Sequence, residues 1–382
     1  MEFDTVCIHG NLTRNDQMGS VSMPIYQTAT FSHPAVGEST GYDYSRTQNP
    51  TREQLEKTIA RLENGTEALA FSSGMAAIAA LMELFQPGDH IIASDDLYGG
   101  TYRLFEHISL KNGLQIDFVD TSAPENIELS LKENTVAFFI ETPTNPLMQI
   151  TDIRAVSTMA QKSKALLVVD NTFLTPYLQR PLTIGADIVV HSGTKYLSGH
   201  NDTLAGFLVT DDNLIAEKLR LIMKTTGACL APFDSWLVLR GIKTLAVRLD
   251  RQQASAMKIA GFLQSSELVK EVYFPGIQSH PGYKTTMNQA SGFGAMISFT
   301  VEHEQIARRV LNHVTIIQYA ESLGGVESLI TYPILQTHAD MPADILEAKG
   351  INRSLLRLSV GLENADDLIS DLEKALEDHT QT

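Results

Sequence analysis

Between residues 67 and 210, short apolar runs alternate with helix-like stretches, and this rhythm constrains the fold more than any other feature. Several runs are rich in Val and Ile, as in His90–Ala93, Leu166–Val169 and Ile188–Val190. Apolar runs of this length are typical of strands buried on both faces, and helical stretches between them are typical of βαβ crossovers. We therefore predict an α/β domain with a mostly parallel sheet, covered by helices on both faces.

The chain on either side of this rhythm has a different character. Residues 1 to about 48 lack sustained periodicity, so we predict an extended arm over residues 1–48 that packs on a neighbouring subunit. The alternating segments predict a central sheet domain over residues 49–240. Beyond it, strand-like and helical segments follow in a new order, as in Ala295–Phe299 and Glu304–Leu311. This change predicts a smaller α+β domain over residues 241–382.

Two helices are expected to frame the second domain. Asp234–Leu263 has apolar residues recurring on one side, which predicts one long helix, and Gly241 interrupts it where a kink is expected. A final helix is predicted over Ala365–Glu377. Asn364 stands at its N-cap position, and Asp366 in its first turn favours the helix dipole.

The charge of the chain excludes several kinds of partner. The 382 residues include 29 Lys and Arg against 45 Asp and Glu, a formal net charge of −16. We therefore expect neither nucleic acid nor an anionic membrane as a partner. No apolar run approaches the ~20 residues of a membrane span, and the N-terminus lacks a signal-peptide core, so a cytoplasmic protein is expected. Cys7 and Cys229 lack the spacing of a zinc site, and we expect no metal.

The strongest local signal surrounds Lys195. The apolar run Ile188–Val190 ends in a turn of small residues that presents the hydroxyls of Ser192 and Thr194 directly before this lysine. Such hydroxyls, together with turn amides, form a nest for an anion such as phosphate. A lysine placed there either contacts the phosphate or attacks a carbonyl as an amine, although a solvated lysine after a strand is the commoner case. The pattern of a nucleotide P-loop is absent.

Three weaker signals complete a pattern. Asp170 follows an apolar strand and lies one βαβ step before Lys195, so the two residues are expected on neighbouring strand ends. Small residues in Ser72–Ala77 join a strand to a helix, whose first amides bind phosphate, and Tyr98 follows another strand. Each signal alone also fits a cap, an ordinary turn or a core tyrosine. Together they describe the way in which pyridoxal phosphate (PLP) is held.

The chain resembles the Cys/Met-metabolism family of PLP-dependent enzymes, which includes cystathionine γ-synthases, cystathionine γ- and β-lyases and methionine γ-lyases. The resemblance covers essentially the whole chain and rests on eight ordered motifs: Tyr44–Arg46 with Asn49–Arg52, Ser73–Ala76, Tyr98–Thr101, Glu141–Pro146, Val169–Thr172, His191–Tyr196, Glu321–Gly325 and Leu356–Ser359. It implies PLP as cofactor and the PLP-dependent transferase fold type I, with a mostly parallel seven-stranded sheet in the PLP-binding domain, a C-terminal α+β domain and an N-terminal arm. It also implies a homo-oligomer, a tetramer built as a dimer of dimers.

The resemblance implies roles for residues around the cofactor. Lys195 would bind PLP as a Schiff base and then serve as a mobile base, Asp170 would pair with the pyridine nitrogen, and Tyr98 would stack on the ring. Tyr44 and Arg46 would reach the phosphate from the partner subunit, which explains the irregular arm. Within one subunit, the phosphate would be held by Gly74, Met75, Ser192 and Thr194.

Further residues would bind the substrate. Arg357 would clamp the α-carboxylate, since a planar guanidinium suits bidentate binding. Glu327 resembles the glutamate that γ-synthases and γ-lyases place near the distal end of the substrate. Other residues expected around the substrate or the phenolic edge of the cofactor are Glu141, Asn145, Ser322 and Thr337.

The resemblance is closest to the γ-acting members. Gly100 stands where methionine γ-lyases have a characteristic cysteine, and Gly199–Asp202 is similar to bacterial γ-synthases that also accept sulfide. These features favour synthesis of cystathionine from an O-acylhomoserine and cysteine, with a cystathionine γ- or β-lyase as the alternative. A non-catalytic PLP-binding regulator would need a DNA-binding extension and a basic surface, and a nicotinamide dehydrogenase would need a G-x-G-x-x-G turn. The sequence shows none of these features.

Overall fold

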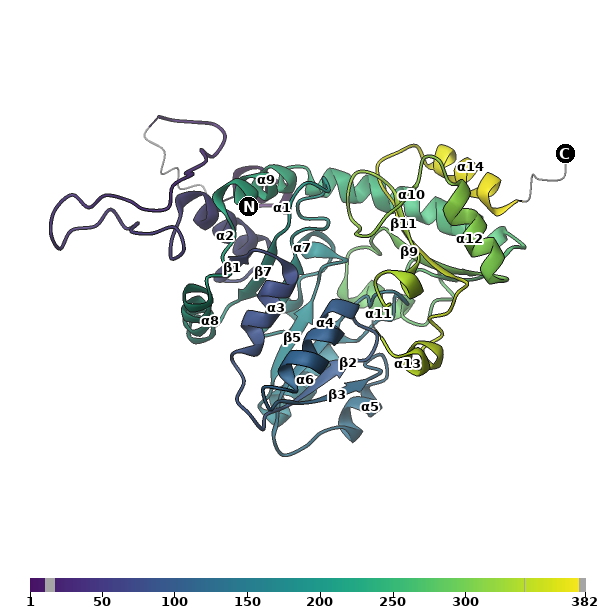
Figure 1. Ribbon diagram of the computed structural model, residues 1–382, viewed down its shortest axis with the longest axis horizontal. Helices are drawn as coiled ribbons and strands as arrows, with labels where there is room; N and C mark the ends of the chain where they lie inside the picture. The colour runs from purple at the N-terminus through teal and green to yellow at the C-terminus, as the bar shows by residue number, and fades with distance from the viewer. Residues whose placement is uncertain (11–17, 340, 378–382) are drawn as a thin grey trace.

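Two β-sheets, one from the middle of the chain and one from its C-terminal part, organise the fold (Figure 1). The computed structural model describes residues 1–10, 18–339 and 341–377. Residues 11–17 of the predicted arm, and residues 340 and 378–382 of the predicted C-terminal domain, therefore lie outside the described residues.

The seven-stranded sheet realises the predicted βαβ rhythm. Its strands are β1 (Glu67–Phe71), β2 (His90–Ser94), β3 (Gln115–Val119), β4 (Thr135–Glu141), β5 (Leu166–Asp170), β6 (Ile188–Ser192) and β7 (Gly206–Thr210). They lie in the order β1-β7-β6-β5-β4-β2-β3, in which β7 runs antiparallel to both neighbours and all other neighbouring pairs are parallel. The mostly parallel sheet predicted from the sequence is confirmed.

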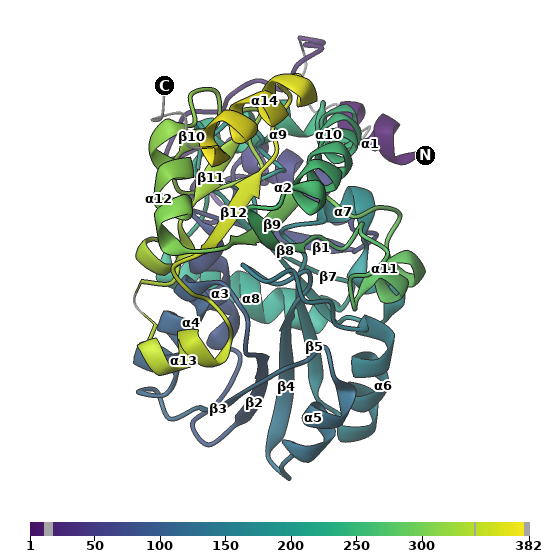
Figure 2. The ribbon, with the colours of Figure 1, turned by 90° about the vertical axis from the view of Figure 1, so that its right-hand side faces the viewer.

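Helices cover both faces of this sheet. Those nearest to it are α2 (Pro50–Leu62), α3 (Gly74–Met82), α4 (Gly99–Leu104), α6 (Ile153–Ser163) and α8 (Asn213–Thr226). Figure 2 shows α3 and α4 on one side of the strands and α6 on the other. Because side chains alternate along a strand, Val168 and Val190 pack into the core beneath α3 and α8, whereas Val169 and Val189 pack into the core beneath α2 and α6.

The five-stranded sheet belongs to the C-terminal part. Its strands are β8 (Val269–Tyr273), β9 (Met296–Val301), β10 (Gln318–Tyr319), β11 (Leu329–Thr331) and β12 (Leu355–Ser359), in the order β10-β11-β12-β9-β8. The helices of this part are α10 (Leu245–Ser265), α11 (Tyr283–Gln289), α12 (Glu304–His313), α13 (Ala343–Ala348) and α14 (Ala365–Leu376). As predicted, Asn364 caps the last helix, because its side chain accepts a hydrogen bond from the backbone N–H of Asp366 at 2.8 Å.

The prediction of one long helix over Asp234–Leu263 is wrong. The structure has two helices, α9 (Pro232–Ile242) and α10, and the expected kink at Gly241 is a complete break just after it. A Cβ on Gly241 would lie 2.0 Å from the backbone oxygen of Ser198, so α9 approaches another backbone there. The Gly241 carbonyl, at the end of α9, accepts hydrogen bonds from the backbone N–H of Thr244 at 3.2 Å and from Arg248 Nη2 at 2.9 Å.

The N-terminal arm is partly regular, contrary to the expectation. Residues Phe3–His9 form α1, which the sequence analysis missed, and Val6 and Cys7 of this helix are buried. From residue 18 to 48 the chain has no helix or strand apart from an isolated bridge between Thr30 and Tyr44. This segment extends away from the rest of the molecule at the left of Figure 1.

Short elements complete the described chain: α5 (Pro124–Leu129), α7 (Thr175–Leu178), the π-helical turn Phe105–Ser109 and the 3-10 turns Pro181–Ile184 and Pro333–Leu335. Every helix in the described part of the chain is too short or too polar to cross a membrane.

Candidate active site

A cavity of about 320 Å³ lies at the carboxyl edge of the parallel strands, where β4, β5 and β6 end and the C-terminal part closes over them. Most of the residues predicted from the sequence line it: Gly74, Met75, Tyr98, Glu141, Asn145, Asp170, Ser192, Thr194, Lys195, Ser322, Thr337 and Arg357. Three predicted residues do not line this cavity: Tyr44, Arg46 and Glu327. The strand ends bring the first group together, as expected for an α/β sheet.

Lys195 lies three residues after β6 and points into the cavity. Its Nζ donates a hydrogen bond to Ser322 Oγ at 2.8 Å, and no carboxylate among the described residues forms an ion pair with it. The pKa of Lys195 is lowered to about 8, chiefly by burial and also by the positive charge of Arg357, while Glu321 opposes the shift. A lysine with this pKa is a usable nucleophile and base near neutral pH.

Ser322, the partner of Lys195, has a strained backbone. Its φ of +86° is in the left-handed region, which is uncommon for a residue other than glycine. The conformation directs its hydroxyl toward Lys195 while its carbonyl accepts a hydrogen bond from Arg357 Nη2 at 3.0 Å. Ser322 thus connects the amine of Lys195 to the guanidinium of Arg357. Backbone strain of this kind is typical of functional sites.

Asp170 ends β5 with its carboxylate toward the cavity. Asp170 Oδ1 accepts hydrogen bonds from the backbone N–H of Thr172 at 3.0 Å and from its hydroxyl at 2.6 Å. Burial raises the pKa of Asp170, while the bonds from Thr172 and the charge of His191 lower it. These interactions oppose the cost of burying the charge, so Asp170 is suited to hold a cation such as a protonated pyridine nitrogen.

Glu141 ends the neighbouring strand β4 and pairs in register with Asp170. Burial raises its pKa well above the ordinary range, and the charge of Asp170 raises it further. The backbone N–H of Tyr98 donates to Glu141 Oε2 at 2.9 Å, which partly opposes this shift. Two adjacent buried carboxyls do not both ionise readily. With two hydrogen bonds from Thr172, Asp170 is better suited than Glu141 to hold the charge.

The turn between β1 and α3 forms a cradle at the other end of the cavity. Ser73 caps α3 by accepting a hydrogen bond from the N–H of Ala76 at 3.0 Å. A Cβ on Gly74 would lie 3.0 Å from Ser192 Cβ, and one on Gly206 would lie 2.0 Å from Ser73 O. Glycine is therefore needed to bring the turn against β6 and β7. The first amides of α3 lack helical partners, and this arrangement suits phosphate.

Arg357 projects from β12 and is almost completely buried. Its Nη1 donates to Asn145 Oδ1 at 2.7 Å, and its Nη2 donates to Thr331 Oγ1 at 3.1 Å as well as to Ser322. Its Nε is buried without a hydrogen-bond partner, and no carboxylate among the described residues forms an ion pair with it. Burial lowers the pKa of Arg357 to about 10. A buried cation at a cavity without an anionic partner is a natural site for a substrate carboxylate.

Tyr98 precedes α4 and is 40% exposed. A Cβ on Gly100 would lie 2.4 Å from Tyr98 Cε1, so glycine at this position leaves room for the ring. A Cβ on Gly99 would meet the backbone oxygen of Thr337 at 2.2 Å, which shows how closely the segment after β11 approaches α4. The two glycines therefore set how Tyr98 and Thr337 line the cavity.

Glu327 lines a second, adjoining hollow of about 660 Å³, which shares Thr194, Leu204, Glu321 and Ser322 with the first. Glu327 Oε2 accepts a hydrogen bond from Asn201 Nδ2 at 2.7 Å. The sequence analysis missed Glu321, which lines both hollows and raises the pKa of both Lys195 and Arg357. The sequence feature that could have indicated Glu321 is its position directly before Ser322, in the motif Glu321–Gly325.

Tyr44 and Arg46 lie in the arm and do not reach the cavity of their own chain. The Arg46 guanidinium lies 5.5 Å from the centre of the Tyr44 ring and donates a hydrogen bond to the backbone oxygen of Lys224. Both side chains are exposed. Their predicted contact with the phosphate of a partner subunit stays a prediction.

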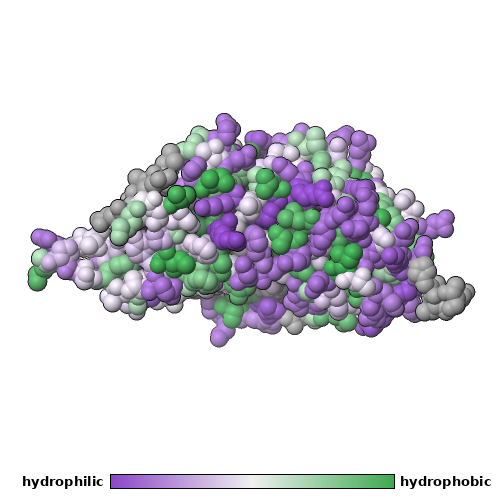
Figure 3. All heavy atoms as spheres, turned by 90° about the horizontal axis from the view of Figure 1, so that it is seen from above, coloured by the Kyte–Doolittle hydropathy of each residue, from purple (hydrophilic) through white to green (hydrophobic). Residues whose placement is uncertain are grey.

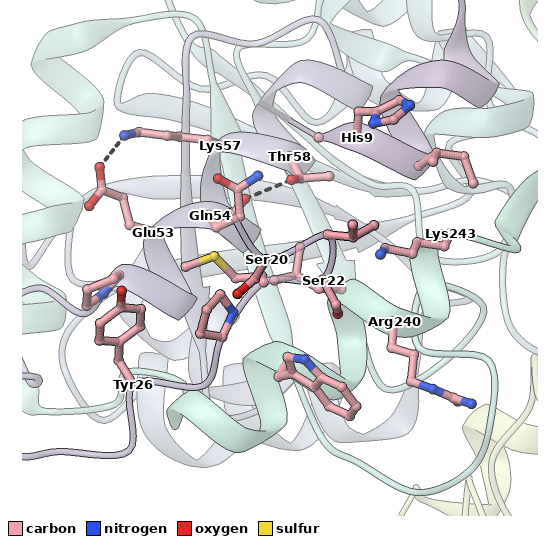
Figure 4. Close-up of a pocket in the computed structure, with 18 of the residues that line it drawn as sticks. His9, Ser20, Ser22, Tyr26, Glu53, Gln54, Lys57, Thr58, Arg240 and Lys243 are labelled. Atoms are coloured by element: carbon pink, nitrogen blue, oxygen red, sulfur yellow. Dashed lines mark hydrogen bonds and ion pairs between the residues drawn. The ribbon is translucent and has the colours of Figure 1, made fainter. Parts of the chain in front are cut away.

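The arm also borders a larger hollow of about 860 Å³ (Figure 4). Ser20, Ser22 and Tyr26 of the arm face Gln54 of α2 and Arg240 of α9 across it. None of the residues predicted to bind cofactor or substrate lines this hollow.

The cavity at the strand edge fits PLP in three respects. Lys195 offers an amine without a carboxylate partner, the glycine-lined turn at Gly74 leaves a cradle at a helix N-terminus, and Asp170 offers an anion at a neighbouring strand end. Fold and cavity together define a PLP-dependent enzyme of fold type I.

Comparison with known proteins identifies the family. The sequence model for the Cys/Met metabolism PLP-dependent enzymes matches residues 4–377, and the chain belongs to this family. A cystathionine γ-lyase of Bacillus subtilis is 48% identical, over 99% of this chain and 100% of its own length. A cystathionine γ-synthase/O-acetylhomoserine (thiol)-lyase of the same species is 49% identical, over 95% of this chain and 93% of its own. A cystathionine γ-synthase structure from Xanthomonas oryzae, in complex with aminoacrylate and cysteine, has a TM-score of 0.96 at 41% identity and covers 98% of both chains.

The family assignment confirms the predicted fold class and PLP as the cofactor. The chain is therefore a trans-sulfuration enzyme of methionine and cysteine metabolism, either a cystathionine γ-synthase or a cystathionine lyase.

Proposed function

We propose that the enzyme is a cystathionine γ-synthase. It replaces the acyloxy group at Cγ of an O-acylhomoserine by the sulfur of cysteine, with sulfide as a further acceptor. The C–O bond breaks, a C–S bond forms, and the acid leaves with the thiol proton. The observation that carries the proposal is the acidic hollow beside Lys195 and Arg357, which contains Asp202, Glu321 and Glu327.

The chain supplies the groups that such a replacement requires. PLP, when bound, provides an electron-withdrawing ring that stabilises negative charge developing on the substrate. Arg357 would bind the α-carboxylate and fix the substrate relative to Lys195. Displacement at Cγ requires removal of a proton first from Cα and then from Cβ, and Lys195 Nζ would perform both transfers. Asp170 would hold the proton on the pyridine nitrogen.

The acidic hollow would receive the second amino acid. Cysteine and cystathionine carry an amino group at the end remote from the reacting carbon, whereas sulfide carries none. Glu321 lines both hollows, and Glu327 lines the outer one, so both are suited to attract an ammonium group. Of the two glutamates, Glu321 acts more strongly on Lys195, because its charge raises the pKa of that lysine.

We also propose that Tyr44 and Arg46 complete the phosphate site of a partner subunit in a tetramer built as a dimer of dimers. The arm that carries them is largely exposed, including the apolar side chains of Val21 and Val36. The face seen in Figure 3 likewise has hydrophobic side chains set between hydrophilic ones. Association of chains would cover such surface.

Product analysis tests the proposed reaction. The purified holoenzyme is given O-acetyl-, O-succinyl- or O-phosphohomoserine with cysteine, and in parallel cystathionine alone. Cystathionine formation from one of the esters supports the proposal. Cleavage of cystathionine without reaction of any ester would assign a lyase instead, which is the second candidate because the Bacillus subtilis relative at 48% identity has that name.

A further inference from the structure

A buried carboxyl group, that of Asp96, lies beside the active-site cavity without lining it. Asp96 follows β2 and stands two residues before Tyr98. Its Oδ2 accepts hydrogen bonds from the hydroxyl of Thr144 and from the backbone N–H of Leu147, the second at 3.2 Å. Both donors belong to the turn of residues 142–149 that follows β4. Because β2 and β4 are neighbours in the sheet, Asp96 joins the ends of two adjacent strands.

The turn after β4 is also closed by hydrogen bonds of its own. The backbone N–H of Thr144 donates to the carbonyl of Gln149 at 3.0 Å, and the Thr144 hydroxyl accepts a hydrogen bond from the backbone N–H of Gln149 at 2.8 Å. Asn145 lies within this closed turn, between the two residues that donate to Asp96. The single oxygen of Asp96 therefore fixes the turn on both sides of Asn145.

Asn145 connects the turn to the guanidinium in the cavity. Asn145 Oδ1 accepts a hydrogen bond from Arg357 Nη1 at 2.7 Å, and the Asn145 carbonyl accepts one from His338 Nε2 at 3.1 Å. Arg357 comes from β12 of the second sheet, so this contact joins the two sheets at the cavity. Because a guanidinium is planar, the direction of one N–H fixes the directions of the others. A shift of Asn145 would therefore also turn the unpartnered Nε of Arg357.

Burial of Asp96 is unfavourable for a carboxyl group taken by itself. Its Oδ1 is buried without a hydrogen-bond partner among the described residues, and this leaves part of the cost of burial uncompensated. The nearby Lys349 forms an ion pair with Asp95, at 2.7 Å. Both hydrogen bonds that Asp96 Oδ2 accepts go to the turn that carries Asn145. What Asp96 supplies in return for its burial is therefore the placement of this turn.

We propose that Asp96 is a positioning residue for substrate binding. It holds the turn after β4 in the place where Asn145 directs the Arg357 guanidinium toward the α-carboxylate of the substrate. Asp96 acts through these residues, since it does not itself line the cavity. The inference rests on the α-carboxylate role of Arg357 proposed above, and it holds equally for a synthase and a lyase.

The test compares two probes that differ by a carboxylate. Glycine and methylamine both present an amine to bound PLP, but only glycine carries a carboxylate for Arg357. Their dissociation constants are measured from the absorbance change of the holoenzyme, at a PLP concentration that saturates each variant, so that altered cofactor binding does not contribute. Asp96→Ala should weaken glycine binding roughly tenfold, as expected when one hydrogen bond to a charged group is lost, and change methylamine binding by less than about twofold.

Thr144 offers a matched pair of variants. Thr144→Val keeps the shape of the side chain but removes the hydroxyl that donates to Asp96, whereas Thr144→Ser keeps the hydroxyl. Thr144→Val should weaken glycine binding as Asp96→Ala does, and Thr144→Ser should retain most of the wild-type affinity. Because Asp96→Ala and Thr144→Val remove the same interaction, the double variant should lose little more than either single one.

Asp187 provides a control at the opposite edge of the same sheet. Its Oδ2 accepts a hydrogen bond from the backbone N–H of Leu167 at 2.7 Å, near the amino ends of β5 and β6. Asp187→Ala should lower thermal stability without changing the affinity for either probe. Arg357→Lys is the positive control and should weaken glycine binding most.

The outcomes separate the two proposals. If Arg357→Lys weakens glycine binding while Asp96→Ala and Thr144→Val leave it at the wild-type value, the positioning role is wrong and the role of Arg357 stands. If Arg357→Lys also has no effect, the role of Arg357 is wrong and the inference fails with it. Equal losses for glycine and methylamine in Asp96→Ala, or a loss in Asp187→Ala, would show a general disturbance and overturn the inference. Should Asp96→Ala fail to fold, the two Thr144 variants decide.

Discussion

Two hollows of this chain differ in the burial and pairing of the charged residues that line them, a difference that their volumes do not show. The hollow below the arm measures about 860 Å³ and the cavity at the strand edge about 320 Å³. In the larger one, Lys57 is exposed and pairs with Glu53 one helical turn away, and Arg240 is exposed (Figure 4). In the smaller one, Lys195 is half-buried and Arg357 is buried, and neither has an ionic partner among the described residues. Convergent buried charges, rather than size, distinguish the site of chemistry.

The difference follows from how each hollow is built. Strand ends of a parallel sheet and β12 of the second sheet fix the small cavity, so each side chain has a determined direction. The large hollow is bounded on one side by the arm, which has no regular structure from residue 18 to 48, and its charged residues Lys57 and Arg240 are exposed. The predictions below test this contrast, beginning with the largest effect.

Replacing one lysine in each hollow should give the largest difference in turnover between the two hollows. Lys195→Ala removes the amine that would hold the cofactor and move protons, and we expect turnover to fall by at least about 10³-fold. Lys57→Ala, in the other hollow, should change turnover by less than about threefold, because an exposed ion pair contributes little. Borohydride reduction of the holoenzyme followed by peptide mapping locates the cofactor. A label on any lysine other than Lys195 contradicts the assignment.

The two glutamates of the acidic hollow should differ in effect. Loss of a charge-assisted hydrogen bond of about 1.5–3 kcal/mol lowers kcat/KM by about one to two decades. Glu321→Gln and Glu327→Gln should therefore penalise reaction with cysteine more than reaction with sulfide, which has no amino group. We expect the larger loss for Glu321, since it also lines the inner cavity. Equal losses with both acceptors would remove that glutamate from the acceptor site.

The arm should matter only through a partner subunit. Arg46→Ala should weaken PLP binding by roughly tenfold, as expected for loss of one charged phosphate contact. Mixing Arg46→Ala with Lys195→Ala chains should restore part of the activity, because a hybrid dimer contains one site with both residues intact. Activity is measured after subunit exchange. No recovery in exchanged samples would show that the sites are not shared.

The smallest effect concerns pH. The neutral amine of Lys195 is the form that reacts with the aldehyde of PLP, and its pKa is lowered to about 8. The rate of PLP capture by the apoenzyme should therefore rise with pH and level off above about 8. Arg357→Leu removes a charge that lowers this pKa, so the midpoint should move upward. Stopped-flow absorbance gives the profile, and a midpoint near 10.5, the ordinary value for lysine, would contradict the burial of the amine.

Strand positions followed from the sequence because they depend on local pattern. The runs Leu166–Val169 and Ile188–Val190 form β5 and β6 except for one or two residues at their ends, and Asp170 and Lys195 lie at neighbouring strand ends, as a single βαβ step requires. The break after Gly241 did not follow. Near this break, Gly241 of α9 approaches the Ser198 backbone, a contact between residues distant in sequence.

By itself, the sequence determined the parallel sheet, the family and the residues gathered at its carboxyl edge, because strand periodicity and short motifs are local properties. Only the tertiary structure decided that Glu321 reaches the cavity from which Glu327 is absent, and that Lys195 bonds Ser322. Such placements depend on how the second sheet packs against the first. Packing couples residues more than a hundred positions apart, which no local pattern records.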